Sequence, residues 1–241
     1  MSDKKTKPKT PSAARVQSIE VLRPGNPGVT FSDALDISRG KRILSNLEAD
    51  AILQDEEKRA QYKSLFQGSA WTSTMFVHEA PGVTFGTQVT TDYFTMEIPK
   101  QYRGKVDQIL SFDLYDCTIR DDGSRKVITL KKGAKVRMHQ YPREDGWYFV
   151  DPISGIPTGA QVKSSDPNAR YLWQRDDEAW IGPLVRWGGD FVDGRRFVSA
   201  FNRPVNGRGV GVVVGATVRF KKGKKHRCNC RYCTRKGGIE D

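Results

Sequence analysis

Four residues with metal-binding side chains lie close together near the end of the chain: His226, Cys228, Cys230 and Cys233. Three thiols and one imidazole match, in number and kind, the ligands of a tetrahedral zinc site. The cations around them favour the thiolate form, which is the form that binds metal. We therefore expect these residues to bind zinc, alone or with ligands from elsewhere. The alternative is a basic segment that carries free thiols.

This cluster lies in one of two basic segments, which together hold almost all of the net charge of +12. Residues 1–17 contain five cations and one acid, a net charge of +4, and residues 217–241 contain nine cations and two acids, a net charge of +7. The intervening residues 18–216 are therefore nearly neutral. Two cationic ends on a neutral body are typical of a protein that binds a polyanion.

Nucleic acid is the polyanion that we expect first, with RNA favoured, and an anionic membrane surface is the second choice. Cations placed against phosphates release counterions, which gives strong, salt-sensitive affinity. Tyr232 is expected to stack on a base. The predicted nucleic-acid-binding residues are Lys4, Lys5, Lys7, Lys9, Arg219, Lys221, Lys222, Lys224, Lys225, Arg227, Arg231, Tyr232, Arg235 and Lys236. The basic run is also typical of a nuclear localisation signal, and the alternative is a tail that only solubilises the protein.

The sequence RFKKGKKHR at 219–227, followed by clustered cysteines, resembles the cysteine-rich nucleic-acid-binding proteins of several plant RNA viruses. A basic arm on a β-rich body also resembles, in architecture, small viral capsid and matrix proteins. The first resemblance implies a viral protein that packages or sequesters RNA. The second implies a virion structural protein whose body forms homo-oligomers while its tails contact genome or membrane.

The pattern of apolar residues predicts an α+β, mainly antiparallel β fold with an N-terminal helical segment and disordered basic tails. We expect a disordered arm at 1–17, a helical segment at 18–70, a β-rich body at 71–216 and a Cys/His tail at 217–241. Within the second segment, residues 18–22 favour a short strand, and residues 31–67 favour helix. Ser32 and Asp33 are the expected cap, Ile43 and Leu44 belong to the apolar helical pattern, and the acids at 55–57 open a second helix.

Runs of β-branched and aromatic residues predict the strands of the body. They lie at 74–80, 83–91, 93–98, 109–119, 126–130, 197–201 and 210–220. The sequence Asp121-Asp122-Gly123-Ser124 predicts a hairpin turn. Residues 128–162 resemble an SH3-like small barrel, a fold that hosts many functions. Residues 164–175 are expected to form a polar loop.

The sequence offers little support for an enzyme. Cys117 with His78 or His139 would be a nucleophile and its base, but Cys117 lies in an alternating strand pattern and is expected to be a core residue. Four aspartates would supply a divalent metal site: Asp113, Asp116, Asp121 and Asp122. Two of them lie at the predicted turn, where aspartate is common. The glycines at 207–211 lead into a strand rather than a helix, which argues against a dinucleotide loop.

Arginines alternate with aromatic residues between Arg170 and Trp187. This stretch would form a platform for base stacking, although core tryptophans with arginines at their rim are the more common arrangement. The sequence holds no 18-residue apolar window, so we expect no transmembrane helix. The cysteine pattern favours a reducing compartment. We therefore expect an intracellular protein, in cytoplasm or nucleus, or a virion component.

Overall fold

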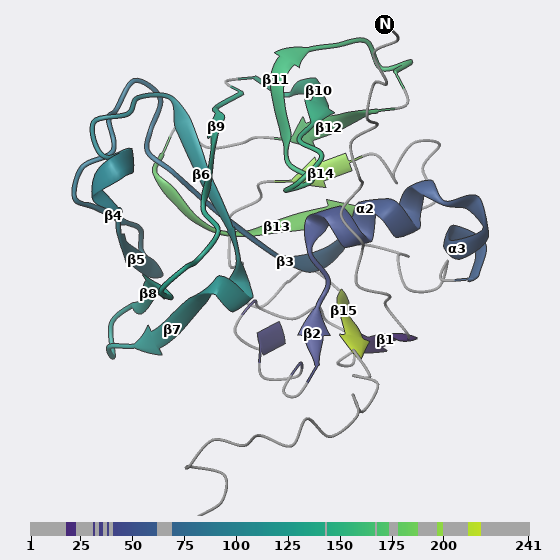
Figure 1. The fold of residues 1–241 in the computed structure, drawn as a ribbon, viewed down its shortest axis with the longest axis horizontal. Coiled ribbons are helices and arrows are strands. Elements are labelled where there is room, and N and C mark those ends of the chain that lie inside the picture. The colour runs from purple at the N-terminus through teal and green to yellow at the C-terminus, as the bar shows by residue number, and fades with distance from the viewer. Residues whose placement is uncertain are drawn as a thin grey trace, which may run out of the picture.

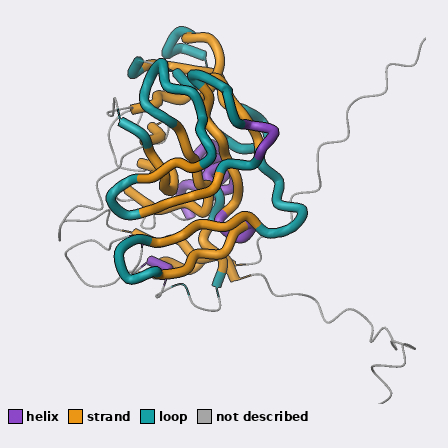
Figure 2. The backbone as a smooth tube through the Cα atoms, turned by 90° about the vertical axis from the view of Figure 1, so that its left-hand side faces the viewer, coloured by secondary structure: helices purple, strands orange, loops and turns teal. Residues whose placement is uncertain are grey.

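Strands dominate the computed structural model, which describes residues 18–22, 31, 34–35, 38, 41–61, 69–142, 144–166, 168–173, 178–187, 197–199 and 212–217. Figure 2 shows strands through most of this part of the chain, with a few short helices. Ten of the thirteen strand pairings between the described strands are antiparallel. The protein is therefore α+β and mainly antiparallel β, as the sequence predicts.

The larger sheet has eleven strands among the described residues, eight of them in the order β1-β15-β3-β13-β14-β12-β10-β11. Strand β2 pairs with β15, β6 pairs with β3, and β9 pairs with β6. The strands of this sheet are β1 (Ser18–Leu22), β2 (Arg42–Ile43), β3 (Ser69–His78), β6 (Gln108–Asp113), β9 (Arg137–Gln140), β10 (Gly146–Val150), β11 (Pro157–Gln161), β12 (Ala169–Trp173), β13 (Trp180–Trp187), β14 (Phe197–Ser199) and β15 (Val212–Thr217).

The smaller sheet has four strands in the order β4-β5-β8-β7 and lies at the left of Figure 1. Its strands are β4 (Gln88–Thr90), β5 (Phe94–Glu97), β7 (Cys117–Asp121) and β8 (Lys126–Leu130). Strands β7 and β8 form the predicted hairpin, with Asp121 opposite Lys126. The Asp122 carboxylate accepts backbone N–H bonds from Ser124 (3.0 Å) and Arg125 (2.6 Å). Aspartate stabilises this turn because its side chain bonds the backbone a few residues ahead.

The main core lies between the two sheets. Met75 and Leu110 of the larger sheet and Met96 and Ile128 of the smaller one are almost completely buried in one apolar cluster. A second cluster lies on the opposite face of β3 and β6, where Phe76 packs with residues of β10, β12 and β13. Strand β3 is therefore buried on both faces, which explains why its sequence does not alternate between apolar and polar residues.

The two short helices α2 (Asn46–Gln54) and α3 (Glu56–Gln61) lie at the right of Figure 1. Helix α2 begins after Ser45, whose hydroxyl accepts the Glu48 N–H (3.3 Å) while the Glu48 carboxylate accepts the Ser45 N–H (2.8 Å). This capping box fixes the start of the helix. The acids at 56 and 57 open α3, as predicted.

A buried ion pair joins α2 to the larger sheet. Arg170 donates to Asp50 from Nε (2.7 Å) and from Nη2 (2.8 Å), and both side chains are about nine-tenths buried. Two parallel bonds to one carboxylate fix the orientation of both groups. The pair therefore holds β12 at a defined place against the helix.

Four of the strand and helix predictions are wrong in part. The expected strand at 83–91 is reduced to β4 at 88–90, because Phe85 exchanges backbone bonds with Gly104 and Lys105 instead. Ile43 and Leu44 are extended rather than helical, because β2 pairs Ile43 with Gly215 and the capping box starts the helix only after Ser45. Residues 169–173 form β12 rather than a loop. The expected strand at 109–119 is interrupted by the 3₁₀ turn η3 (Leu114–Asp116), because the Asp113 carboxylate accepts the Tyr115 N–H (2.9 Å).

Other predictions are confirmed or stay untested. Residues 18–22 form a strand, as expected. Residues 128–162 contribute strands to both sheets, β8 to the smaller one and β9, β10 and β11 to the larger one. The resemblance of this stretch to an SH3-like barrel stays a prediction. The expected cap at Ser32 and Asp33 and the expected tails lie outside the described residues.

Candidate functional site

The residues predicted to bind nucleic acid and zinc all lie in 1–17 and 218–241, outside the described residues. The structure does show where these two basic segments join the fold. Strand β1 pairs antiparallel with β15, and Ser18 lies opposite Thr217. Ser18 directly follows the first basic segment, and Thr217 directly precedes the cations of the second. Paired residues of antiparallel strands have Cα atoms about 5 Å apart, so both basic segments leave the fold from one place.

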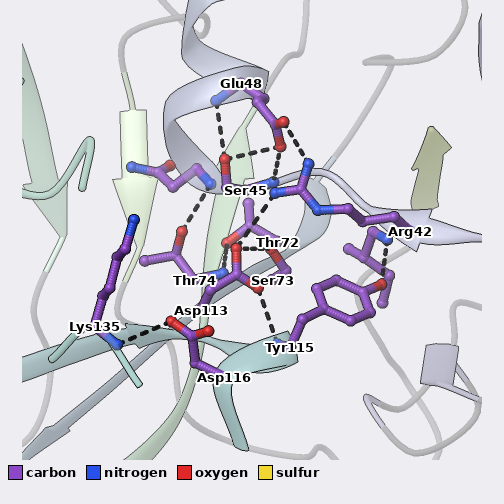
Figure 3. A network of polar contacts seen from close by, with 12 residues as sticks. Arg42, Ser45, Glu48, Thr72, Ser73, Thr74, Asp113, Tyr115, Asp116 and Lys135 are labelled. Carbon is purple, nitrogen blue, oxygen red and sulfur yellow. Dashed lines mark hydrogen bonds and ion pairs between the residues drawn. The ribbon is translucent and has the colours of Figure 1, made fainter. Parts of the chain in front are cut away.

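Tyr115 lies near the Ser18–Thr217 pair. Strand β2, on the opposite edge of β15 from β1, connects the two. Strand β2 pairs Arg42 with Ala216 and Ile43 with Gly215. The backbone N–H of Ile43 donates to the hydroxyl of Tyr115 (2.6 Å). Figure 3 shows Tyr115 below Arg42, at the margin of a polar network that includes Ser45, Glu48 and Asp113. Tyr115 is nonetheless 38% exposed.

Arg42 contacts three members of this polar network. Its guanidinium pairs with Glu48 and with Asp113 (3.4 Å), and lies 5.8 Å from the centroid of the Tyr115 ring. Burial opposes the charged guanidinium, but the bonds and charges of Glu48 and Asp113 outweigh it and raise the pKa of Arg42. Burial raises the pKa of Asp113 and of Tyr115. These contacts fix the position of Arg42 within the polar network, and its guanidinium stays charged.

A hollow of about 290 Å³ opens beside Tyr115. Leu35, Leu114 and Ile119 supply apolar walls, and Lys41, Tyr115 and Cys117 also line it. Burial raises the pKa of the Cys117 thiol to about 12, so this part of the lining is neutral at physiological pH. The Cys117 thiol donates to the Leu114 carbonyl (3.1 Å). The hollow is therefore mainly apolar, with a lysine in its lining.

Further lysines come from the connection between β8 and β9. The ammonium of Lys131 donates to the backbone carbonyl of Tyr115 (2.8 Å), and Lys132 and Lys135 are exposed. The backbone N–H of Lys135 donates to the Asp116 carboxylate (3.2 Å). A carbonyl does not neutralise an ammonium, so Lys131 brings a net positive charge to the Tyr115 backbone.

The candidate nucleophile and bases have other partners. His78 Nδ1 is 3.0 Å from the Glu79 carbonyl, and His139 Nε2 is 2.8 Å from the Ser111 hydroxyl. Burial lowers the pKa of both histidines, and Cys117 is a core residue, as expected.

The four candidate aspartates serve turns and ion pairs: Asp113 and Asp116 bond the backbone of Tyr115 and Lys135, and Asp121 and Asp122 bond the hairpin. Throughout the described ranges, no group of three or more histidine, cysteine and acidic side chains is placed to hold a metal.

The arginine–aromatic stretch is divided between core and surface. Arg170 and Trp180 are buried, whereas Tyr171 is half-buried and its ring meets that of Trp147 edge-on, with centroids 5.5 Å apart. Burial and the charge of Asp145 raise the pKa of Tyr171. The carboxylate beside this aromatic pair makes it a poor place for a phosphate backbone.

Sequence reasoning missed Tyr115 and the lysines beside it as site residues. Lys131 and Lys132 appear in the sequence only as part of a Lys-Lys-Gly turn. The one available signal was an excess of cations over acids between residues 116 and 135. The contact of Lys131 with Tyr115 could not be predicted, because it depends on the path of the chain through the β7–β8 hairpin.

No protein-family model, curated protein or solved structure matches the chain. No helix in the described part of the chain has the length and apolar character that crossing a membrane requires.

Proposed function

We propose that this chain is a non-enzymatic nucleic-acid-binding protein, with RNA as the favoured ligand, that holds the phosphate backbone through its two basic terminal segments. The pairing of Ser18 with Thr217 is the observation that carries the proposal. It anchors segments with net charges of +4 and +7 at one place on the fold. One stretch of nucleic acid therefore meets the charges of both segments together.

Zinc ligation by His226, Cys228, Cys230 and Cys233 belongs to this proposal. Their thiolates and imidazole would supply all four ligands of a structural zinc site. Such a site would shorten the second basic segment and fix the direction in which its cations point.

Salt dependence of RNA binding tests the proposal. In the full chain, Lys221, Lys222, Lys224 and Lys225 are changed to Gln, and binding of a short single-stranded RNA is measured by fluorescence anisotropy over a range of salt. Each phosphate contact of a single strand contributes about 0.7 to the slope of log K against log salt. We expect the slope to fall by about 3, because four contacts are removed.

The matched control changes four exposed cations of the body to Gln: Lys100, Lys105, Arg125 and Lys163. It alters the net charge equally, and we expect a much smaller change in slope. Equal changes in both variants would show a non-specific effect of net charge. A wild-type chain that binds neither RNA nor DNA would refute the proposal.

A virion structural role, as capsid or matrix protein, is the second candidate. One observation favours it: β11 ends the path of the larger sheet, and the connection before it carries Ile153, which is 58% exposed. End strands and exposed apolar side chains favour association between copies. Sedimentation of the full chain separates the two functions, because large assemblies support the structural role and a monomer or dimer supports a binding protein.

A further inference from the structure

We propose that the hollow beside Tyr115 seats one base of a single-stranded nucleic acid, whose adjoining phosphates contact Lys131 and Lys132. This inference rests on the proposed function and deepens it. It adds to the basic segments a site on the folded body, and it names the single strand as the form of nucleic acid that the protein prefers.

The position of the hollow is the first argument. Strands β1 and β2 pair with the two opposite edges of β15, next to Thr217 and Ala216. Adjacent strands are about 5 Å apart, so the backbone of Arg42 lies about 10 Å from that of Ser18. The Ile43 N–H then joins β2 directly to Tyr115. The hollow is therefore close to the place where the basic segments join the fold, within reach of a strand that they hold.

The charges around the hollow are the second argument. Lys41 lines it, and the Lys131 ammonium bonds the Tyr115 carbonyl at its margin. Asp113 pairs with Arg42, whereas Asp116 bonds the backbone N–H of Lys135, which leaves its negative charge in place. The exposed Lys131, Lys132 and Lys135 outnumber this acid, so the connection between β8 and β9 carries the net positive charge that attracts a phosphate.

Size and lining are the third argument. A volume of about 290 Å³ lies at the lower end of the range for small-molecule sites, which suits one flat base. The walls of Leu35, Leu114 and Ile119 suit its apolar faces, and Tyr115, which lines the hollow and is partly exposed, offers an aromatic surface for stacking. A base enters such a hollow only from an unpaired strand, because duplex bases are stacked on one another.

Two substitutions at Tyr115 separate stacking from support of the fold. Tyr115→Phe removes the hydroxyl bonded by Ile43 and keeps the ring, whereas Tyr115→Ala removes both. Stacking on an aromatic side chain contributes enough that its loss weakens binding about 5- to 150-fold. We expect that loss for Tyr115→Ala and near wild-type affinity for Tyr115→Phe, measured in the full chain with a short single-stranded RNA. If Tyr115→Phe weakens binding as much as Tyr115→Ala, the ring does not stack and the inference fails.

A lysine pair tests the phosphate contacts, because Gln at 131 removes the charge and keeps a donor for the Tyr115 carbonyl. Lys131→Gln with Lys132→Gln is compared with Lys105→Gln with Lys163→Gln, an exposed pair elsewhere on the body. The first pair should lower the salt slope by about 1.4, which corresponds to two contacts with a single strand, and the second pair should leave it nearly unchanged. Equal effects of the two pairs would overturn the inference.

The same measurements distinguish failure of the inference from failure of the proposed function. Duplex RNA of the same sequence should bind the wild-type chain with no sensitivity to Tyr115→Ala. If duplex and single strand lose affinity alike, the hollow takes no base. If the wild-type chain binds RNA with a steep salt slope but neither variant at the hollow changes it, the basic segments alone bind and the inference is wrong.

Discussion

At the scale of single residues, burial decides what the titratable side chains of the body can do. His78 lies between Phe76 and Tyr141, with ring centroids 5.8 and 4.6 Å away. Burial lowers its pKa from 6.5 to about 4, against the opposing bond to the Glu79 carbonyl. Burial also acts on Cys117, and it raises the pKa of this thiol. The groups that looked most reactive in the sequence are therefore neutral core residues at physiological pH.

The depressed pKa of His78 predicts how stability depends on pH. Above about pH 6.5 the histidine is neutral in both the folded and the unfolded chain. Between 6.5 and 4 the unfolded chain binds the proton and the folded chain does not, so the free energy of unfolding falls as the pH falls. A shift from 6.5 to about 4 corresponds to about 3 kcal/mol at most.

Urea unfolding of the wild-type chain and of His78→Gln at pH 7 and pH 4.5 checks this prediction. The substitution removes the titrating group and keeps a donor for the Glu79 carbonyl. We expect the wild type to lose more stability than the variant on acidification. An equal loss in both would mean that His78 takes up a proton in the folded state.

At the scale of elements, side-chain bonds to the backbone set the boundaries that apolar periodicity could not locate. Ile43 and Leu44 fit a helical pattern together with Leu47 and Ala51, yet the helix starts only after Ser45. Periodicity reports which residues are buried, and Ile43 is buried in a strand. The capping box of Ser45 and Glu48 is a local signal that was readable in the sequence, whereas the pairing of Ile43 with Gly215 is not.

The connection between β10 and β11 packs tightly on the start of α2. Gly155 has φ +72°, and a Cβ there would lie 2.8 Å from both Cα and N of Leu47. Gly133 has φ +82° with nothing within 4 Å of its Cβ position. We expect Gly133→Ala to cost about 1 kcal/mol from backbone strain, and Gly155→Ala to cost about 1–3 kcal/mol more from the clash.

Equilibrium urea unfolding of the two alanine variants measures this difference. Because the left-handed backbone is common to both positions, the difference isolates the contact with α2. Equal destabilisation would show that α2 moves away from the connection at little cost.

At the scale of the whole molecule, β1 and β15 place side by side the two residues that adjoin the basic segments, Ser18 and Thr217. This predicts that the basic segments contribute interchangeably to RNA binding. Four N-terminal lysines (4, 5, 7 and 9) changed to Gln should lower the salt slope by about 3, as much as the four C-terminal lysines at 221, 222, 224 and 225. The measurement is RNA-binding anisotropy over a range of salt, with the four-cation body variant as control.

Unequal effects of the two lysine sets would show that the segments engage different ligands. A loss confined to the N-terminal set, for example, would leave the C-terminal segment free for zinc or for a second partner. In that case the shared anchor at Ser18 and Thr217 would not unite the two segments in function.

The sequence by itself determined the fold class, the hairpin at 121–124, the core position of Cys117 and the concentration of charge at the two ends. These follow from composition, periodicity and turn chemistry, which are local properties of the chain. Tertiary structure decided that Arg170 is buried against Asp50, that Tyr115 and Lys131 meet, and that both basic segments leave from one strand pair. Those contacts join residues from 16 to 199 positions apart, and local patterns carry no information about such distances.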